Sequence, residues 1–303
     1  MVDLPENEDG TFYRREVTVS FKGSVFEGST PFRHAAEIEK IVRQLECIKP
    51  ILMIYSDGGP DHRITYRSVK LALIILFKRL GIDVLIAART APGNSWANPA
   101  ERVMSTPNLA LQNTAPTRSE STSQFERVLN SANSMNDIRN KSSKVPGLKE
   151  AWLEPVKPIK TLLEDHTSRL SLKERQFKIQ GAASIKEVTQ VEKQLNSNID
   201  PDIEVRKYQQ QHLKSKKAHM QFLRDYCIER HYMFQIQKCN NPDCCTPRMS
   251  EELFRPLPDP MLEFNNKDHN RQFSSFALNE VTTEAHRPSA SNRTPVQLQK
   301  RYR

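Results

Sequence analysis

Two short runs of apolar residues, each of strand length, most constrain what this chain can fold into. The first covers residues 51–55 (Ile-Leu-Met-Ile-Tyr) and the second covers residues 84–87 (Val-Leu-Ile-Ala). Between them, residues 65–79 have the pattern of an amphipathic to fully apolar helix that ends at Gly81, a residue that favours helix C-termini. Continuous apolar runs of this length are typical of strands buried on both faces of a sheet. This part of the chain therefore predicts an α/β fold.

The neighbouring segments extend the same pattern. Residues 17–21 alternate between apolar and polar side chains, which predicts a strand. Residues 29–31 (Ser-Thr-Pro) mark the start of a helix that runs until Pro50. A further helix is expected to begin near Asn98 and Pro99, because proline favours the first helical turn. The expected core is a mixed sheet with flanking helices, in which the loops after the strands carry function.

Beyond residue 112 the chain becomes more polar, in keeping with a hydrophobic content of only 37% and a mean hydropathy of −0.65. Helices are expected near residues 125–129, 156–169, 171–179, 184–196 and 202–228, with a short strand at 232–236. The expected organisation is a polar N-terminal arm (1–15), a partial α/β core (16–112), a Ser/Thr/Asn-rich linker (113–147), a helical region (148–231), a cysteine-rich segment (232–262) and a disordered tail (263–303).

Charge and composition limit the classes of partner that the chain is expected to bind. The chain has 45 Lys and Arg residues against 36 Asp and Glu residues, a net charge of +9, which suits DNA or another nucleic acid as well as a plain basic surface. No secretion signal is recognised, and the longest apolar stretch, residues 71–77, is too short to span a membrane. We therefore expect a nuclear or otherwise intracellular protein with no membrane partner, and the sequence leaves its oligomeric state open.

Two carboxylates stand where the predicted α/β layout places function. Asp57 follows the first apolar run in a turn, and Glu101 lies in the first turn of the helix that begins near Pro99. Carboxylates brought together at a sheet edge can hold Mg²⁺ or Mn²⁺, and two such ions can promote phosphodiester cleavage. Each acid also has a simpler interpretation, since aspartate is common in turns and acids are favoured at helix N-termini.

The sequence around these acids resembles a known family. Residues 56–60 (Ser-Asp-Gly-Gly-Pro) and 91–102 (Ala-Pro-Gly-Asn-Ser-Trp-Ala-Asn-Pro-Ala-Glu-Arg) are similar to the catalytic cores of DDE-type transposases and retroviral integrases. The resemblance implies a partial RNase H-like core in residues 16–112, with Asp57 and Glu101 as the second and third catalytic metal ligands. It also implies phosphate contacts from His62, Arg63 and Arg102. Residues 11–112 further resemble a set of transposon-derived invertebrate proteins.

One departure from the family pattern changes the expected activity. The family places its first aspartate in a strand that precedes the one at residues 17–21, and Asp3 and Asp9 stand in a polar segment, so neither is assigned. The resemblance then implies an N-terminally truncated or degenerate copy that has largely lost cleavage and strand transfer. Pro107 adds to this expectation, because a proline inside the helix that bears Glu101 is predicted to kink or break it.

A group of cysteines near residue 240 is the second candidate site. Thiolate and imidazole ligands suit a tetrahedral Zn²⁺ site, whereas irregular spacing suits free cysteines equally well. The candidate zinc ligands are Cys227, His231, Cys239 and one of Cys244 or Cys245.

A basic stretch in the expected helix at residues 202–228 gives a third candidate. Lys214, Lys216 and Lys217 could contact phosphates, or they could form a solvated helix face. Three functional hypotheses follow. The first is an inactive core fragment derived from a transposase or integrase. The others are a domesticated nucleic-acid-binding module without catalysis and a protein-interaction scaffold with a zinc knot.

Overall fold

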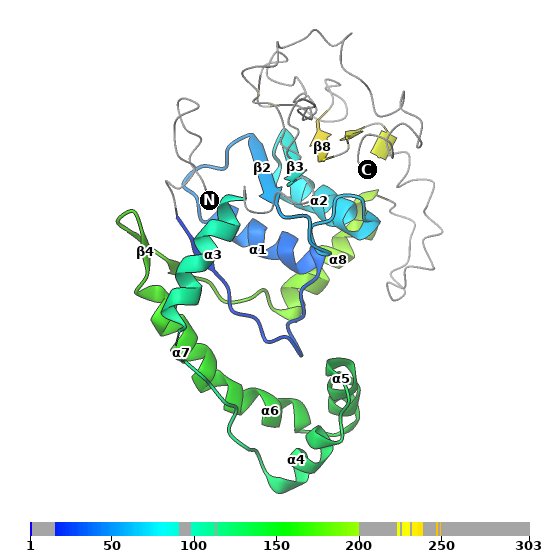
Figure 1. The fold of residues 1–303 in the computed structure, drawn as a ribbon. Coiled ribbons are helices and arrows are strands. Elements are labelled where there is room, and N and C mark those ends of the chain that lie inside the picture. The colour runs from blue at the N-terminus through cyan, green and yellow to red at the C-terminus, as the bar shows by residue number, and fades with distance from the viewer. Residues whose placement is uncertain are drawn as a thin grey trace, which may run out of the picture. The chain divides into compact units, whose positions relative to one another are not determined.

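Two compact units make up the chain, and each unit is built from two separated segments (Figure 1). The structure, a computed structural model, describes Met1 and residues 16–90, 98–112, 114–199, 223, 224, 226–230, 232–238, 247 and 249. Unit 1 comprises Met1–Ser29 and Pro99–Ile185, and unit 2 comprises Thr30–Asn98 and Lys186–Arg303. The segment expected to form one core, residues 16–112, therefore contributes to both units.

The described residues of unit 2 form a mixed four-stranded sheet and three helices, so the α/β class is confirmed. The strand order is β2-β3-β8-β7; β2 and β3 are parallel, and the other neighbouring pairs are antiparallel. The elements are α1 (Pro31–Arg43), β2 (Ile51–Ser56), α2 (Arg67–Leu80), β3 (Val84–Arg89), α8 (Ile185–Ile199), β7 (Cys227–Glu229) and β8 (Met233–Gln237).

Local signals start α1 and end α2 as the sequence predicts, although α1 ends at Arg43 and not at the expected Pro50. The Thr30 side chain accepts a hydrogen bond from the backbone N–H of Arg33, and Pro31 occupies the first turn of α1. Helix α2 ends at Gly81, whose left-handed backbone (φ 61°) lets its N–H donate to the carbonyl of Phe77. Both helix predictions are confirmed, since they depend on residues that are close in sequence.

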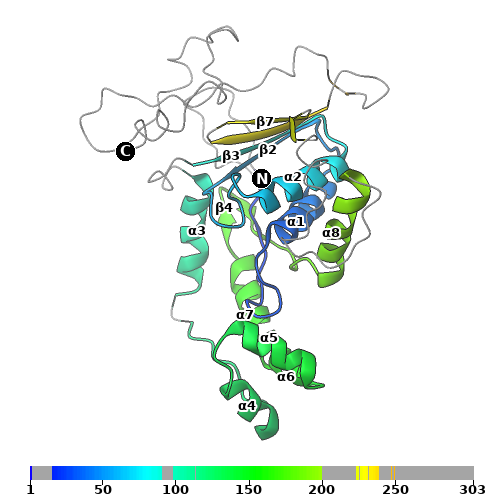
Figure 2. The same cartoon turned by 90° about the vertical axis from the view of Figure 1, so that its right-hand side faces the viewer.

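The core of unit 2 lies between the sheet and α2. Figure 2 shows α1, α2 and α8 on one side of the sheet. Leu71, Ile74 and Ile75 of α2 are each 1% exposed, and Leu85 and Ile236 of the central strands are fully buried. On the other face, Val84, Ile86 and Met233 form a buried cluster against which Met249 packs. Among the described residues, no helix has both the length and the apolar character that a membrane crossing requires.

Strand β2 differs from the expectation that it is buried on both faces. Its even-numbered side chains face the helices, but Ile51, Met53 and Tyr55 are 41%, 49% and 43% exposed. The reason is its position, because β2 is an edge strand and the cluster around Ile86 lies on the inner strands. An apolar run shows that a strand is favourable, but it does not show how many neighbours the strand has.

The part of unit 1 that the structure describes is mostly helical and has two small sheets. Strand β1 pairs in parallel with β6, while β4 and β5 form an antiparallel hairpin. The strand predicted at residues 17–21 is thus shorter than expected and does not join the sheet of unit 2. The elements are β1 (Thr18–Val19), α3 (Pro99–Ala110), α4 (Ser123–Asn130), α5 (Met135–Lys144), α6 (Leu148–Leu153), η2 (Glu154–Val156), α7 (Lys157–Ser168), β4 (Ser171–Leu172), β5 (Arg175–Gln176) and β6 (Lys178–Ile179).

Several elements beyond residue 100 differ from those that the sequence predicts. The expected helix at 171–179 is instead a hairpin, whose turn residues Lys173 and Glu174 have φ values of 46° and 72°. The expected linker contains the helices α4 and α5, and the residues at 227–229 form a strand. Helix α3 continues past Pro107, because the Pro107 carbonyl still accepts a hydrogen bond from Leu111 N–H.

An ion pair fixes the start of α4 in unit 1. The Arg118 guanidinium donates from its two terminal nitrogens to the two carboxylate oxygens of Glu126, at 2.7 and 2.6 Å. This pairing, together with a hydrogen bond from Ser121 N–H, lowers the pKa of Glu126 to about 2. The guanidinium also lies 5.1 Å from the ring centre of Trp152 in α6. These contacts give a fixed conformation to a segment that composition alone predicts to be an irregular linker.

Candidate functional site

The turn after β2 places Asp57 at the carboxyl end of the parallel strands. Thr90, which follows β3, donates its backbone N–H to the Ser56 carbonyl at 2.9 Å and its hydroxyl to the Asp57 carbonyl at 3.2 Å. Gly58 then adopts a left-handed backbone (φ 76°), and Gly59 N–H donates to Asp57 Oδ1 at 3.0 Å. The backbone of Asp57 is therefore held in place, and its carboxylate remains exposed.

Arg89 lies directly beside this turn. It ends β3 opposite Ser56, and a Cβ added at Gly58 would lie 3.2 Å from Arg89 Cδ. Its guanidinium carbon is 5.3 Å from the ring centre of Tyr232, and its buried Nε has no hydrogen-bond partner among the described residues. Sequence reasoning did not identify Arg89. The available signal was an arginine closing an apolar strand that runs parallel to the strand before Asp57.

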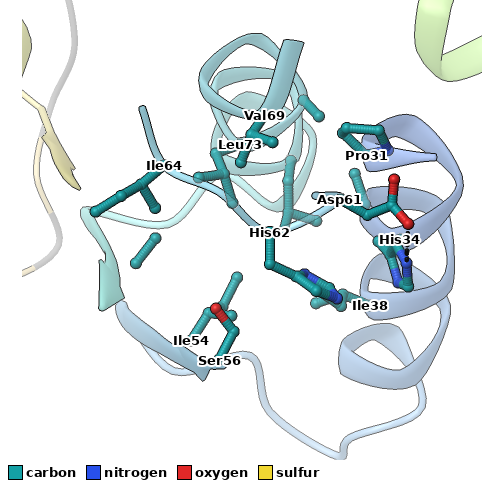
Figure 3. A pocket seen from close by; sticks show the side chains of 14 residues that line it. Pro31, His34, Ile38, Ile54, Ser56, Asp61, His62, Ile64, Val69 and Leu73 are labelled. Atoms are coloured by element: carbon teal, nitrogen blue, oxygen red, sulfur yellow. Dashed lines mark ion pairs between the residues drawn. The ribbon is translucent and has the colours of Figure 1, made fainter. Parts of the chain in front are cut away.

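A histidine pair lies next to the same turn (Figure 3). His62 N–H donates to the Gly59 carbonyl at 2.9 Å, and the ring of His62 lies 4.3 Å from that of His34 in α1. His34 Nε2 is also 3.9 Å from Asp61 Oδ2. The sequence predicts His62 as a phosphate contact but does not identify His34, because a preceding helix supplies it.

The side chains of His34, Asp61 and His62 line a small pocket together with Ile54 and Ser56 of β2. Its volume is about 30 Å³, which is room for about two water molecules. A nucleotide base or a sugar is much larger than this space. The enclosed space is therefore too small to surround a whole nucleotide.

Arg63 adds a second cation, which is exposed, to this end of unit 2. Its Nη1 donates to the Tyr66 hydroxyl at 3.2 Å, and its guanidinium lies 5.0 Å from the centre of the Tyr66 ring. Both side chains are exposed. An arginine held against an aromatic ring keeps free donors for an anion while losing little freedom on binding. Arg63 therefore remains a candidate phosphate contact, as the sequence predicts.

Glu101 belongs to the other unit. It lies exposed in the first turn of α3, in unit 1, whereas Asp57 lies in unit 2. The loop at residues 91–97 and the side chain of Arg102 lie outside the described residues. Within the described part of the chain, no group of three or more His, Cys, Asp and Glu side chains is arranged to hold a metal ion. The pairing of Asp57 with Glu101 around Mg²⁺ therefore stays a prediction.

The zinc and lysine predictions fall mainly outside the described residues. Among the candidate zinc ligands only Cys227 is described, in β7, where it pairs with Ile236 of β8. Burial, together with the nearby charge of Glu229, raises the pKa of the Cys227 thiol to about 12. The candidates outside the description are His231, Cys239, Cys244 and Cys245, and the basic residues Lys214, Lys216 and Lys217.

The half-buried thiol of Cys227 gives a direct test. At pH 8 a thiol with a pKa of about 12 is ionised in about one molecule in ten thousand, and the thiolate is the reactive form. We expect iodoacetamide to modify the exposed Cys47 while Cys227 stays unmodified, as peptide mass spectrometry can measure. In denaturant both cysteines should react. Equal modification of both residues in the native protein would contradict the raised pKa of Cys227.

Comparison of the chain with protein-family models, curated proteins and solved structures found no match. The geometry at the carboxyl ends of β2 and β3 is therefore the main basis for assigning a function.

Proposed function

We propose that the chain contains a transposase- or integrase-like core that binds the phosphodiester backbone of nucleic acid at the carboxyl ends of β2 and β3. The observation that carries this proposal is the Asp57 turn packed against the Arg89 side chain. In α/β sheets, ligands bind beyond the carboxyl ends of the strands. A guanidinium at that position suits a phosphate, and the exposed Arg63 and the side chain of His62 lie in the same segment.

A divalent metal ion fits the same turn. Gly59 N–H engages only Oδ1 of Asp57, so Oδ2 of this exposed carboxylate can coordinate a cation. Mg²⁺ binds through one or two carboxylates and keeps several waters and substrate oxygens as ligands. We propose Asp57 and Glu101 as the residues that would hold it. When bound, Mg²⁺ supplies charge stabilisation for phosphodiester cleavage.

Cleavage itself is proposed to be largely lost. The residues assigned to the site supply two carboxylates, whereas the family it resembles uses three. With fewer anionic ligands, the metal ions bind more weakly and are positioned less firmly for in-line displacement. Binding of the phosphate backbone does not depend on a third acid, because arginine provides it. The function proposed for the present chain is thus nucleic-acid binding, with cleavage as the ancestral activity.

Arginine 89 is the residue that tests the binding proposal. We expect Arg89→Ala to weaken binding of duplex DNA about equally for unrelated sequences. The slope of log affinity against log salt concentration should fall by about 1, as for the loss of one phosphate contact. Fluorescence anisotropy over a series of KCl concentrations measures both quantities. Lys78→Ala is the matched control, because Lys78 is exposed in the last turn of α2, at the opposite end of unit 2.

The cleavage part of the proposal has a separate test. A nuclease assay with Mn²⁺ is expected to show no cleavage above that of the Asp57→Asn variant. Strong cleavage by the natural chain that disappears in both Asp57→Asn and Glu101→Gln would show an active enzyme instead. If DNA binding does not weaken as salt rises, or if Arg89→Ala and Lys78→Ala behave alike, the proposed phosphate site is wrong.

A further inference from the structure

The outer edge of β2 presents unpaired backbone groups. The carbonyls of Pro50 and Ser56 accept hydrogen bonds from Val84 N–H and Thr90 N–H, both on the β3 side. In a parallel pair, alternate residues direct both their N–H and their C=O groups to the same neighbour. The even-numbered residues of β2 therefore face β3. The backbone groups of Ile51, Met53 and Tyr55 point away from the sheet, where the described residues provide no further strand.

The same three residues carry exposed apolar side chains on one face of the strand. The strand Ile-Leu-Met-Ile-Tyr-Ser contains no charged residue and no proline. Natural edge strands usually carry such residues, because they prevent pairing with another chain. An edge that combines free backbone groups with an apolar face is suited to accept a strand.

We propose that this edge pairs with the β2 strand of a second copy of the chain, antiparallel and centred on a two-fold axis at Met53. In this register Met53 faces Met53 of the other copy, and Ile51 faces Tyr55. Each of these residue pairs consists of outward-facing residues, so each can exchange two backbone hydrogen bonds. The apolar side chains of the two copies then lie side by side on the same face of a continuous eight-stranded sheet.

The charges that flank β2 favour a second copy as the partner. The chain carries a net charge of +9, so two copies repel each other except where their contact is neutral or complementary. Residues 51–56 are neutral. Extending the register by two residues beyond each Ile51–Tyr55 pair places the exposed Lys49 of one copy opposite the exposed Asp57 of the other. A two-fold axis repeats this opposite-charge pair at both ends of the interface.

The first experiment measures the oligomeric state of the full chain. Sedimentation equilibrium over a hundredfold range of concentration is expected to show a monomer and a dimer in exchange. Met53→Lys places two like charges opposite each other at the axis, and it should raise the dissociation constant at least about tenfold. Met104→Lys is the matched control, because it makes the same substitution at a methionine of α3 that is 55% exposed. This variant should leave the dimer unchanged.

The second experiment tests the register by charge reversal. Lys49→Glu alone and Asp57→Lys alone each create two like-charge pairs, so each variant is expected to form a weaker dimer. An equimolar mixture of the two variants restores both opposite-charge pairs, and it should form a heterodimer with nearly the natural affinity. A chain that is monomeric at every concentration overturns the proposal. So does a dimer that Met53→Lys leaves intact, or a mixture that associates no better than its separate components.

Discussion

Replacing Phe234 with alanine is expected to lower the free energy of unfolding of unit 2 by about 3–5 kcal/mol. Phe234 is 1% exposed and stands in β8 between Ala87 of β3 and Glu229 of β7. Its ring lies 5.7 Å from the ammonium of Lys70 in α2. Removing the ring leaves a cavity between the sheet and α2, which the surrounding strands cannot close without breaking their register.

Urea unfolding followed by circular dichroism measures this loss, and hydrogen exchange of the β3 amides assigns it to unit 2. The control is Met53→Ala in the same sheet, at a concentration below that of dimer formation. Because Met53 is 49% exposed, this change should alter stability by no more than about 0.5 kcal/mol. A similar loss for the two variants would mean that Phe234 does not lie in the core of unit 2.

Asp83→Asn is expected to cost unit 2 about 3 kcal/mol, because it removes one partner of a buried ion pair. Asp83 is fully buried before β3, and its Oδ1 lies 2.9 Å from the ammonium of Lys238, which follows β8. Its Oδ2 accepts a hydrogen bond from Met249 N–H at 3.0 Å. After the substitution the Lys238 ammonium, only 17% exposed, loses its counter-charge.

The same unfolding measurements test this prediction, and an exposed ion pair serves as its control. Lys157 and Glu154 form a pair in which the side chains are 66% and 65% exposed. Water already solvates both charges there, so Glu154→Gln should cost less than about 1 kcal/mol. If Asp83→Asn costs no more than Glu154→Gln, then Lys238 does not depend on Asp83 for its stabilisation.

The sequence predicts the elements of unit 2 that depend on local signals. Thr30 and Pro31 start α1, Gly81 ends α2, and the apolar runs become β2 and β3. The turn with Asp57 follows from the same signals, because it lies directly after a strand.

Features that depend on distant segments could not be predicted in this way. β1 pairs with β6, a strand that follows it by more than 150 residues, and no periodicity near residue 18 specifies that partner. The contribution of Arg89 to the candidate site depends on the register between β2 and β3. His34 reaches the site only because α1 packs beside the turn after β2. Each of these contacts is set by packing between elements.

The discontinuous composition of unit 2 has a consequence for how the protein is made. Strand β3 lies between β2, which precedes it closely, and β8, which the ribosome produces only after all of α3 to α8. Until β8 is made, the apolar residues of β3 in the nascent chain lack one of their two neighbouring strands. Long-range strand pairing of this kind folds slowly and exposes unpaired edges in the meantime. Unit 2 is therefore expected to be the last part of the chain to fold during synthesis and the part most dependent on chaperones.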